Sequence, residues 1–229
     1  MFRLLKLRPP NGWNAVAWEF AIVTLGVVVA LGAQELVQSL HWRREVKETR
    51  KALDAEVARN LASFEYRFNQ RPCVARRLSE LQQWADSHRI GSPITLRKEI
   101  TAPAGYTIRS AVWEVTDGEI ATRIPLEAKM HYAQMYDAMK SFGELRESEE
   151  EQWIALQQLQ DTKRLAADEL RTVAHSIRLL RAVNEVLTSF RVAIDRSANE
   201  LKVSSEKDVE AKSGQIIAKW NRELCKPLL

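Results

Sequence analysis

Four histidines are the first residues to consider for catalysis or metal binding: His41, His88, His131 and His175. None belongs to an HExxH motif and none follows a glutamate by three residues, so the zincin and di-iron bundle signatures are both missing. Glu127 and His131 are four residues apart and share a helical face, which is more typical of a surface ion pair than of a metal site. The sequence therefore predicts no metal at the histidines.

The most acidic run in the chain is the segment 147–151, which holds four glutamates. Carboxylate oxygens suit divalent cations, but the spacing of a calcium-binding EF-hand loop is missing. On a helix, these carboxylates would point around the axis instead of converging on one ion. We therefore predict a solvated helix face here, and for the wider polar segment 144–152 either the same or a join between two helical segments.

Signatures of other chemistry are missing as well. The eight glycines are scattered, so there is no phosphate-binding glycine-rich loop, and there is no GxSxG motif. Once three basic residues before the apolar segment and one acidic residue within it are set aside, 31 basic and 29 acidic residues remain, mixed along the chain. Nucleic-acid-binding domains carry a clear positive surplus. The sequence therefore predicts a non-enzymatic protein with no cofactor and no nucleic-acid partner.

Two cysteines, Cys73 and Cys225, are present, and no second pair suggests a metal site. In an oxidising compartment they can form one disulfide that ties the C-terminal tail to the start of the second helix of the domain. The chain-entropy model assigns a loop of about 150 residues at most about 5 kcal/mol. Two unpaired, half-buried thiols are the alternative.

The segment 13–33 is the most apolar in the chain and contains one charged residue, Glu19. As a helix it reaches roughly 30 Å, the thickness of the hydrocarbon core of a bilayer. We predict a single-pass transmembrane anchor that follows a short basic tail (1–12) and precedes a helical domain (34–229). A cleaved signal peptide is the alternative, but the long, proline-containing start of the chain and Glu19 favour a retained anchor.

The orientation of this anchor is set by the basic residues on its two sides. Arg3, Lys6 and Arg8 precede it, and five basic residues follow within 43–51, so the counts favour neither side decisively. The possible disulfide and the short basic tail favour a cytoplasmic N-terminus and a periplasmic domain.

One face of the predicted anchor combines a carboxylate with small residues. Glu19, Gly26, Ala30 and Ala33 follow one another at spacings of seven, four and three, so they share a helical face. Small residues let another helix approach closely, and a carboxylate facing lipid costs about 2–3 kcal/mol. This face is a candidate for packing against a transmembrane helix of a partner or a second copy; snorkelling of Glu19 to the headgroups is the alternative.

The residues that suggest a family lie within 13–36: Trp13, Ala15, Val16, Glu19, Phe20, Ile22, Val23, Gly26 and Val27, followed by Ala33-Gln34-Glu35. This pattern resembles the opening of a family of bacterial single-pass inner-membrane proteins of uncharacterised function, which have an N-terminal anchor and a helical domain. Beyond this segment, only residues 71–73 and 132–136 are weakly similar to the family. The resemblance implies the architecture and the bacterial inner membrane; it carries over no catalytic residue.

The polar domain is predicted to begin as a continuation of the anchor. Apolar residues recur at helical spacing from Val46 to Phe68, and no glycine or proline interrupts 33–71, so one helix is expected to reach about Asn69. Pro72 suits the first turn of a second helix that runs to about Ile90, with Asn69 as a possible cap. The segment 91–107 has two glycines and two prolines and is expected to be irregular, with a possible short strand.

Four further helical regions follow. A brief helix is expected at 110–115, ended by Asp117-Gly118, and a long helix opens at Pro125. A second long helix has the cleanest apolar period, over 170–201, and Ser205 or Asp208 is expected to cap a last one. The predicted fold class is all-α: a single N-terminal transmembrane helix that continues into an up-and-down helical bundle. Expected buried positions on the long helices are Leu126, Met130, Ala133, Met139, Phe142, Leu145, Trp153 and Leu156, then Leu170, Val173, Ile177, Leu180, Val183, Leu187, Phe190, Ile194, Ala198 and Leu201.

The seven tryptophans divide into two groups. Three suit membrane-interface positions, and four fall on apolar stripes and are expected in the core: Trp13, Trp18 and Trp42, then Trp84, Trp113, Trp153 and Trp220.

Two functions fit these expectations. The first is a non-enzymatic accessory or scaffold subunit of an inner-membrane complex, with a protein partner at the transmembrane helix. The second is a periplasmic ligand-binding bundle without a signalling output of its own, since twelve residues before the anchor are too few for a signalling domain. A lined cavity would favour ligand binding, and a filled core with an exposed apolar surface would favour the scaffold.

Overall fold

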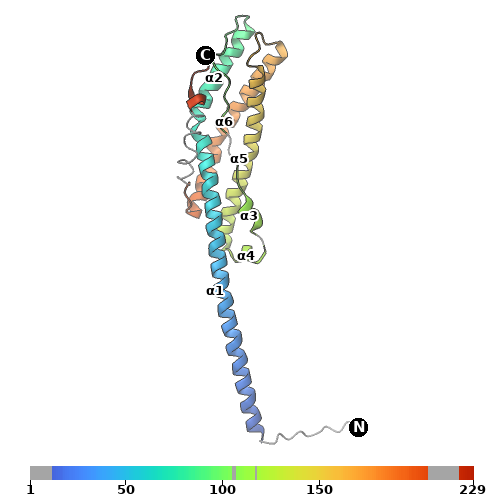
Figure 1. The fold of residues 1–229 in the computed structure, drawn as a ribbon, viewed down its shortest axis with the longest axis vertical. Coiled ribbons are helices and arrows are strands. Elements are labelled where there is room, and N and C mark those ends of the chain that lie inside the picture. The colour runs from blue at the N-terminus through green and yellow to red at the C-terminus, as the bar shows by residue number, and fades with distance from the viewer. Residues whose placement is uncertain (1–11, 105–106, 117, 206–221) are drawn as a thin grey trace, which may run out of the picture. The chain divides into compact units, whose positions relative to one another are not determined.

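The structure, a computed structural model, describes residues 12–104, 107–116, 118–205 and 222–229, and of residues 12–15 only the backbone. These residues form an all-α fold, as predicted (Figure 1). The helices are α1 (Gly12–Asn69), α2 (Arg71–Arg89), α3 (Ala111–Val115), α4 (Gly118–Arg123), α5 (Leu126–Leu159) and α6 (Ala167–Leu201). The expectation of a short strand within 91–107 is wrong for its described part, which is an irregular connection. The chain divides into two compact units, 1–49 and 50–229.

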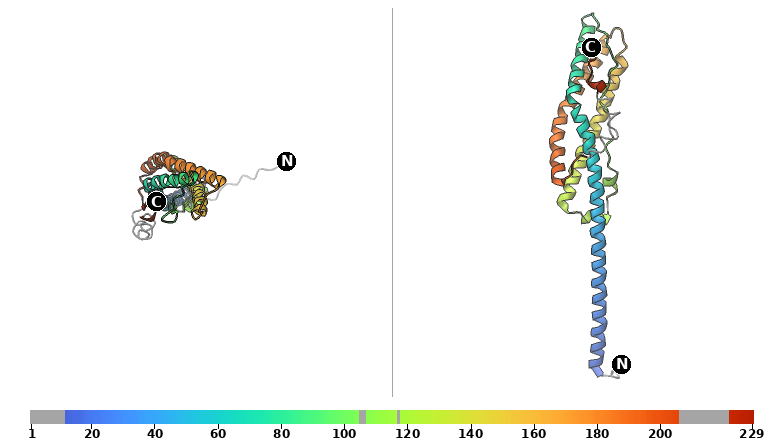
Figure 2. Two further views of the ribbon diagram at one scale, coloured as in Figure 1. Left: turned by 90° about the horizontal axis from the view of Figure 1, so that it is seen from above. Right: turned by 60° about the vertical axis from the view of Figure 1, so that its left-hand side comes forward.

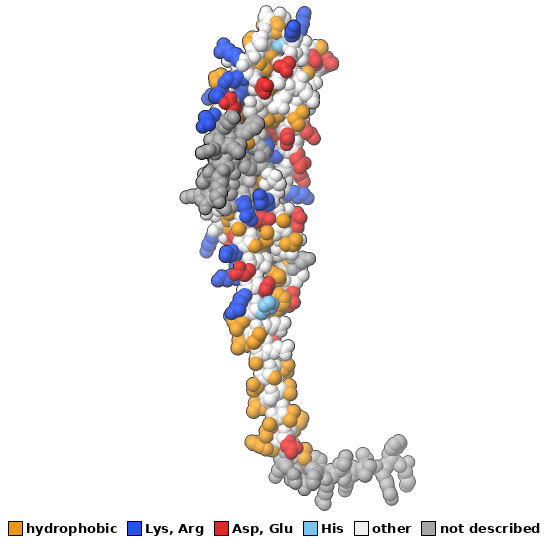
Figure 3. All heavy atoms as spheres, in the orientation of Figure 1, with side chains coloured by type: hydrophobic (Ala, Val, Ile, Leu, Met, Phe, Trp, Pro, Cys, Tyr) orange, Lys and Arg blue, Asp and Glu red, His pale blue; other side chains and the backbone are white. Residues whose placement is uncertain are grey.

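The first unit contains the N-terminal part of α1. An 18-residue window of this helix has a mean hydropathy of 2.1, and none of the window is buried within the protein. In Figure 3, hydrophobic side chains cover this stretch of helix, whereas charges of both signs cover the helices of the second unit. The stretch is therefore long and apolar enough to cross a membrane.

The predicted continuity of α1 is confirmed, since the helix runs unbroken to Asn69. The break that follows has a covalent cause: Pro72 has no backbone N–H, so it cannot bond the carbonyl of Phe68 four residues earlier. Gln70 keeps nearly helical dihedral angles (φ −78°, ψ −12°) and precedes α2 without a side-chain cap. The expectation that Asn69 caps the second helix is therefore wrong; the chain bends from one helix into the next.

In the second unit, three helical columns form a bundle (Figure 2). The end of α1 with α2 makes the first column, and α5 and α6 form an antiparallel pair joined by the segment 160–166. Helix α6 packs against both α5 and α2. The short helix α4 was not expected, because a glycine normally ends a helix; here Gly118 begins one, with a left-handed φ of +57°.

The core of the bundle is filled by aliphatic and aromatic side chains from all three columns and from the C-terminal segment. Trp84 and Trp153 are both 1% exposed, as expected, whereas Trp113 is only half-buried and Trp220 lies outside the described residues. The main cluster contains Val74, Leu78, Leu81, Trp84, Ala85, Ile100, Trp153, Leu156, Leu165, Val173, Ile177, Leu180, Leu224 and Leu228.

Helix α6 follows its predicted face closely, with Leu170 and Phe190 only partly buried. On α5 the expected face is wrong at its start, because Leu126 and Met130 are 72% and 52% exposed. Tyr132, Met135 and Tyr136 are buried instead, which turns the buried stripe toward α1. The expected last helix from Ser205 onward lies outside the described residues apart from its end.

Candidate functional site

The predicted partner face lies on the first unit. Glu19, Gly26, Ala30 and Ala33 are all exposed on α1. At Gly26 an added Cβ would have no neighbouring atom within 4 Å, apart from its own helix backbone. This surface is therefore open for close approach of another helix.

Inside the second unit, a carboxylate lies between two guanidinium groups. Glu149 is fully buried, and Arg67 is 1% exposed. Arg67 donates to Glu149 through Nε (3.1 Å) and Nη2 (2.6 Å), and Arg146 donates from Nη1 at 2.5 Å. The indole Nε1 of Trp153 lies 3.4 Å from the same carboxylate. The expectation of a solvated face across 147–151 is thus wrong at Glu149, and 144–152 is continuous helix instead of a join.

The electrostatics of this cluster keep Glu149 ionised. Burial alone favours the protonated acid, but the charges and hydrogen bonds of Arg67 and then Arg146 outweigh it and lower the pKa of Glu149 below its ordinary value. Its oxygens are occupied by donors, so the carboxylate is suited to fixing the register of α1 against α5 and not to proton transfer. Arg67 also keeps one donor, Nη1, without a hydrogen-bonding partner among the described residues.

The polar cluster around Glu149 extends to α6 through Asn184, whose Oδ1 accepts from Nη2 of Arg67 (3.4 Å). The side chain of Asn184 donates to the backbone carbonyl of Arg71 (3.2 Å), and the backbone carbonyl of Asn184 accepts from Nε of Arg71 (2.7 Å). Neither Asn184 nor Arg71 could be identified from the sequence, because Asn184 does not interrupt the regular spacing of apolar residues on α6. The one sequence signal for the polar cluster was Arg67, a charged residue beside the apolar face of the end of α1.

A second buried carboxylate holds α3. Glu56, 2% exposed, accepts hydrogen bonds from the backbone N–H groups of Val112 (3.0 Å) and Trp113 (3.4 Å) and from the hydroxyl of Tyr136 (2.6 Å). The rings of Trp113 and Tyr136 are stacked, with centroids 5.1 Å apart. Burial, and then the hydrogen bond to Glu56, raises the pKa of Tyr136. The site is structural, since each donor and acceptor is matched.

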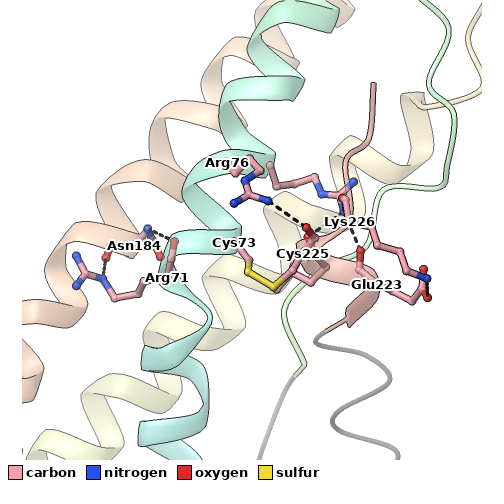
Figure 4. The surroundings of a disulfide bond; sticks show 9 residues. Arg71, Cys73, Arg76, Asn184, Glu223, Cys225 and Lys226 are labelled. Atoms are coloured by element: carbon pink, nitrogen blue, oxygen red, sulfur yellow. Dashed lines mark hydrogen bonds and ion pairs between the residues drawn. A yellow bond between two sulfur atoms is a disulfide. The ribbon is translucent and has the colours of Figure 1, made fainter.

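The two cysteines are joined. Cys73 on α2 and Cys225 form a disulfide with a Cα–Cα distance of 4.8 Å, as the sequence predicted for an oxidising compartment (Figure 4). Beside it, Arg76 donates to the backbone carbonyl of Cys225 (3.3 Å). The bond ties the end of the chain to the start of α2.

The C-terminal segment is also held by hydrogen bonds and burial. Nη2 of the buried Arg77 donates to the carbonyl oxygens of Glu223 (3.1 Å), Leu224 (3.0 Å) and Lys226 (3.1 Å). Leu224 and Leu228 are 2% and 0% exposed. This tail is therefore part of the core, which no sequence period indicated.

The described residues contain no group of three or more His, Cys, Asp or Glu side chains that could hold a metal ion. Glu127 is exposed and His131 half-buried, and no ion pair joins them. His88 is buried instead, and its Nδ1 accepts the backbone N–H of Leu165 (3.2 Å).

No protein-family model, curated protein or solved structure matches this chain.

Proposed function

We propose that this protein is a single-pass inner-membrane protein whose bundle lies in the periplasm and which acts as a non-enzymatic accessory or scaffold subunit. The observation that carries the proposal is the uncovered apolar stretch of α1, with Glu19 on its small-residue face. An intramembrane carboxylate is stabilised when it meets a polar group of a neighbouring helix. The partner is therefore a transmembrane helix of another protein or of a second copy.

The disulfide supports the orientation. Disulfides persist in the periplasm and are rare in the bacterial cytoplasm. The bond between Cys73 and Cys225 therefore supports a second unit on the oxidising side and a basic tail 1–12 in the cytoplasm. The resemblance of segment 13–36 to bacterial inner-membrane proteins supports the same location.

The bundle interior supports a scaffold instead of an enzyme. Buried apolar side chains form its core, and the two buried carboxylates among the described residues, Glu56 and Glu149, accept hydrogen bonds that hold helices together. Such satisfied polar networks rigidify a fold and specify its register. Rigidity serves a subunit that presents a surface to a partner.

Co-purification tests the proposal. The tagged protein is extracted from native membranes in a gentle detergent, and co-purifying proteins are identified by mass spectrometry. We expect a stoichiometric membrane protein, or a homo-oligomer, that is lost in Glu19→Leu. Thr24→Leu is the matched control, because Thr24 is a polar residue five positions after Glu19 and lies about 140° around the helix from it. A monomer in wild type, or equal loss in both variants, would contradict the proposal.

A further inference from the structure

A cavity of about 490 Å³ lies at the end of the second unit where α2 ends and where α5 is joined to α6, the upper end of the bundle in Figure 1. Its walls are the segments 93–99 and 160–163, and Trp84 and His88 of α2 line it as well. Ligand sites of proteins typically enclose roughly 300–1,000 Å³. The cavity is thus large enough for a small organic molecule.

The wall 93–99 has no regular secondary structure, yet backbone hydrogen bonds fix it. The N–H of Ile94 donates to the hydroxyl of Ser87 on α2 (2.9 Å). The N–H of Arg97 donates to the carbonyl of Leu228 (3.0 Å), in the tail that the disulfide fastens. The wall is therefore held before any ligand arrives, which lowers the entropic cost of binding.

The two walls are also tied to each other. The N–H of Ile100 donates to Oε1 of Gln160 (2.8 Å), and the carbonyl of Ile100 accepts from the side chain of Gln157 (2.8 Å). The side chains of Gln157 and Gln160, at the end of α5, thus bond both the carbonyl and the N–H of Ile100. This link joins the end of α5 to the residue that directly follows the wall 93–99.

His88 places a hydrogen-bond donor in the cavity. Its side chain is 6% exposed, and its ring meets Trp84 edge to face, with centroids 5.1 Å apart. Because Nδ1 accepts the N–H of Leu165, the proton of the neutral ring lies on Nε2. Burial lowers the pKa of His88, which favours this neutral form. Nε2 has no hydrogen-bonding partner among the described residues, although the ring lines the cavity.

The remaining lining combines an apolar surface with a surplus of positive charge. The apolar side chains are Trp84, Pro93, Ile94 and Leu96. The charged side chains are the cations Arg97, Lys98 and Lys163 and the carboxylates Glu99 and Asp161. None of these five forms an ion pair within the described part of the chain, so the cations are available to a ligand.

We propose that this cavity binds a small carboxylate with an apolar body. The apolar part lies against Trp84 and Leu96, and the carboxylate accepts from Nε2 of His88 and from the basic side chains of the walls. The inference does not depend on the scaffold role, since every residue involved belongs to the second unit. By the criterion set from the sequence, a lined cavity favours the alternative function, a ligand-binding bundle.

A second hollow on the bundle has a lining of opposite net charge and serves as a comparison. This hollow, of about 940 Å³ and as open to solvent as the cavity at His88, lies between α5 and the segment 107–114. It is lined by five carboxylates and two basic side chains: Glu114, Asp137, Glu144, Glu147 and Glu150 against Lys140 and Arg146. Its negative surplus repels anions. A carboxylate ligand should therefore select the cavity at His88 and leave the second hollow unoccupied.

The test uses the full-length protein in detergent micelles with ¹³C,¹⁵N-labelled histidine. Benzoate and indole-3-acetate are titrated while the histidine ring signals are followed by NMR, and the uncharged amides of both compounds serve as controls. We expect a saturable shift of the His88 signal with each carboxylate and at least about tenfold weaker binding of each amide.

Three variants locate the binding. His88→Asn keeps an acceptor for Leu165, but its shorter side chain has no donor at the position of Nε2. Lys163→Gln removes one wall cation, and each variant should weaken binding about three- to tenfold. Arg164→Gln is the matched control, because Arg164 is exposed and adjacent in the chain but does not line the cavity. Thermal unfolding of each variant checks that the bundle is intact.

Several results would overturn the proposal. These are the absence of a saturable shift with both carboxylates, equal affinity for the amides, or equal weakening in Lys163→Gln and Arg164→Gln. For His88→Asn, whose own signal is lost, the protein is labelled at tryptophan instead, and binding is followed through the indole signal of Trp84, assigned with Trp84→Phe. Failure of this proposal leaves the co-purification result at Glu19 unaffected, so the two are tested separately.

Discussion

At the scale of single residues, Glu149 is a buried carboxylate held between two guanidinium groups. Its carboxylate accepts two hydrogen bonds from Arg67 and one from Arg146, and it is fully buried. Removing one member of such a group leaves an uncompensated charge in the interior, which costs more than the pair contributes.

We therefore expect Glu149→Gln to lower the free energy of unfolding by about 3 kcal/mol. Glu150→Gln, at the neighbouring exposed position, should change it by less than about 0.5 kcal/mol. Urea unfolding of the full-length protein in micelles, followed by tryptophan fluorescence, measures both. Equal stability of the two variants would mean that Glu149 is not in the ion cluster.

The cluster also predicts a pH dependence. Because the pKa of Glu149 is lowered in the folded protein, the unfolded chain takes up its proton first as the pH falls. The contribution of Glu149 is fully present above the unfolded pKa of about 4.3 and is lost as the pH falls through the lower folded value. The stability difference between wild type and Glu149→Gln should be constant from about pH 7 to 5 and shrink below about pH 4. A difference that grows on acidification would contradict the assignment.

The sequence predicted these residues poorly, for a physical reason. Four glutamates in five positions look like a solvated face, and helical spacing cannot tell which one points inward. That depends on Arg67, which is 82 residues away in the chain. Cys73 and Cys225, by contrast, could be paired from the sequence because there was only one way to pair them.

At the scale of elements, the irregular parts of the second unit are held by side chains of the long helices. Asn60 on α1 holds the backbone of Arg109 on both sides, donating to its carbonyl (2.6 Å) and accepting from its N–H (2.9 Å). Together with Glu56, this fixes the approach to α3. The apolar periodicity predicted the helices. It could not predict these hydrogen bonds from Asn60 and Glu56, because a single buried polar residue does not change the spacing of the apolar residues around it.

Asn60→Ala should lower the free energy of unfolding by about 1–3 kcal/mol, since it leaves two backbone groups unsatisfied. It should also speed hydrogen exchange across 107–116 while α6 stays protected. Asn69→Ala, at the exposed end of α1, is the control and should leave exchange unchanged. Unaltered exchange across 107–116 in Asn60→Ala would show that the hydrogen bonds from Asn60 are not formed.

The C-terminal segment is the element that depends most on a covalent link. Replacing both cysteines by serine should lower the free energy of unfolding by up to about 5 kcal/mol, and reduction of the wild type should have the same effect. Maleimide labelling of acid-trapped cells, before and after reduction, reports the bond directly. Labelling without reduction would contradict both the disulfide and the periplasmic orientation.

At the scale of the whole molecule, one chain combines an apolar helical stretch that is exposed on all sides with a helical bundle that buries its apolar side chains. The all-α class and the continuity of α1 to Asn69 followed from the sequence because apolar period and helix breakers are local properties. The tail packing and the cavity at His88 depend on contacts between distant segments, so local patterns did not indicate them. The account therefore depends on whether the small-residue face meets a partner in the membrane.

The most direct measurement is site-specific photocrosslinking in native membranes. A photoreactive amino acid is placed at Ala30, on the small-residue face, or at Val28, about 200° around the same helix. The account predicts one discrete crosslinked product from position 30 that is lost on adding Glu19→Leu, and no such product from position 28. Equal crosslinking from both positions, or lipid adducts alone from position 30, would contradict it.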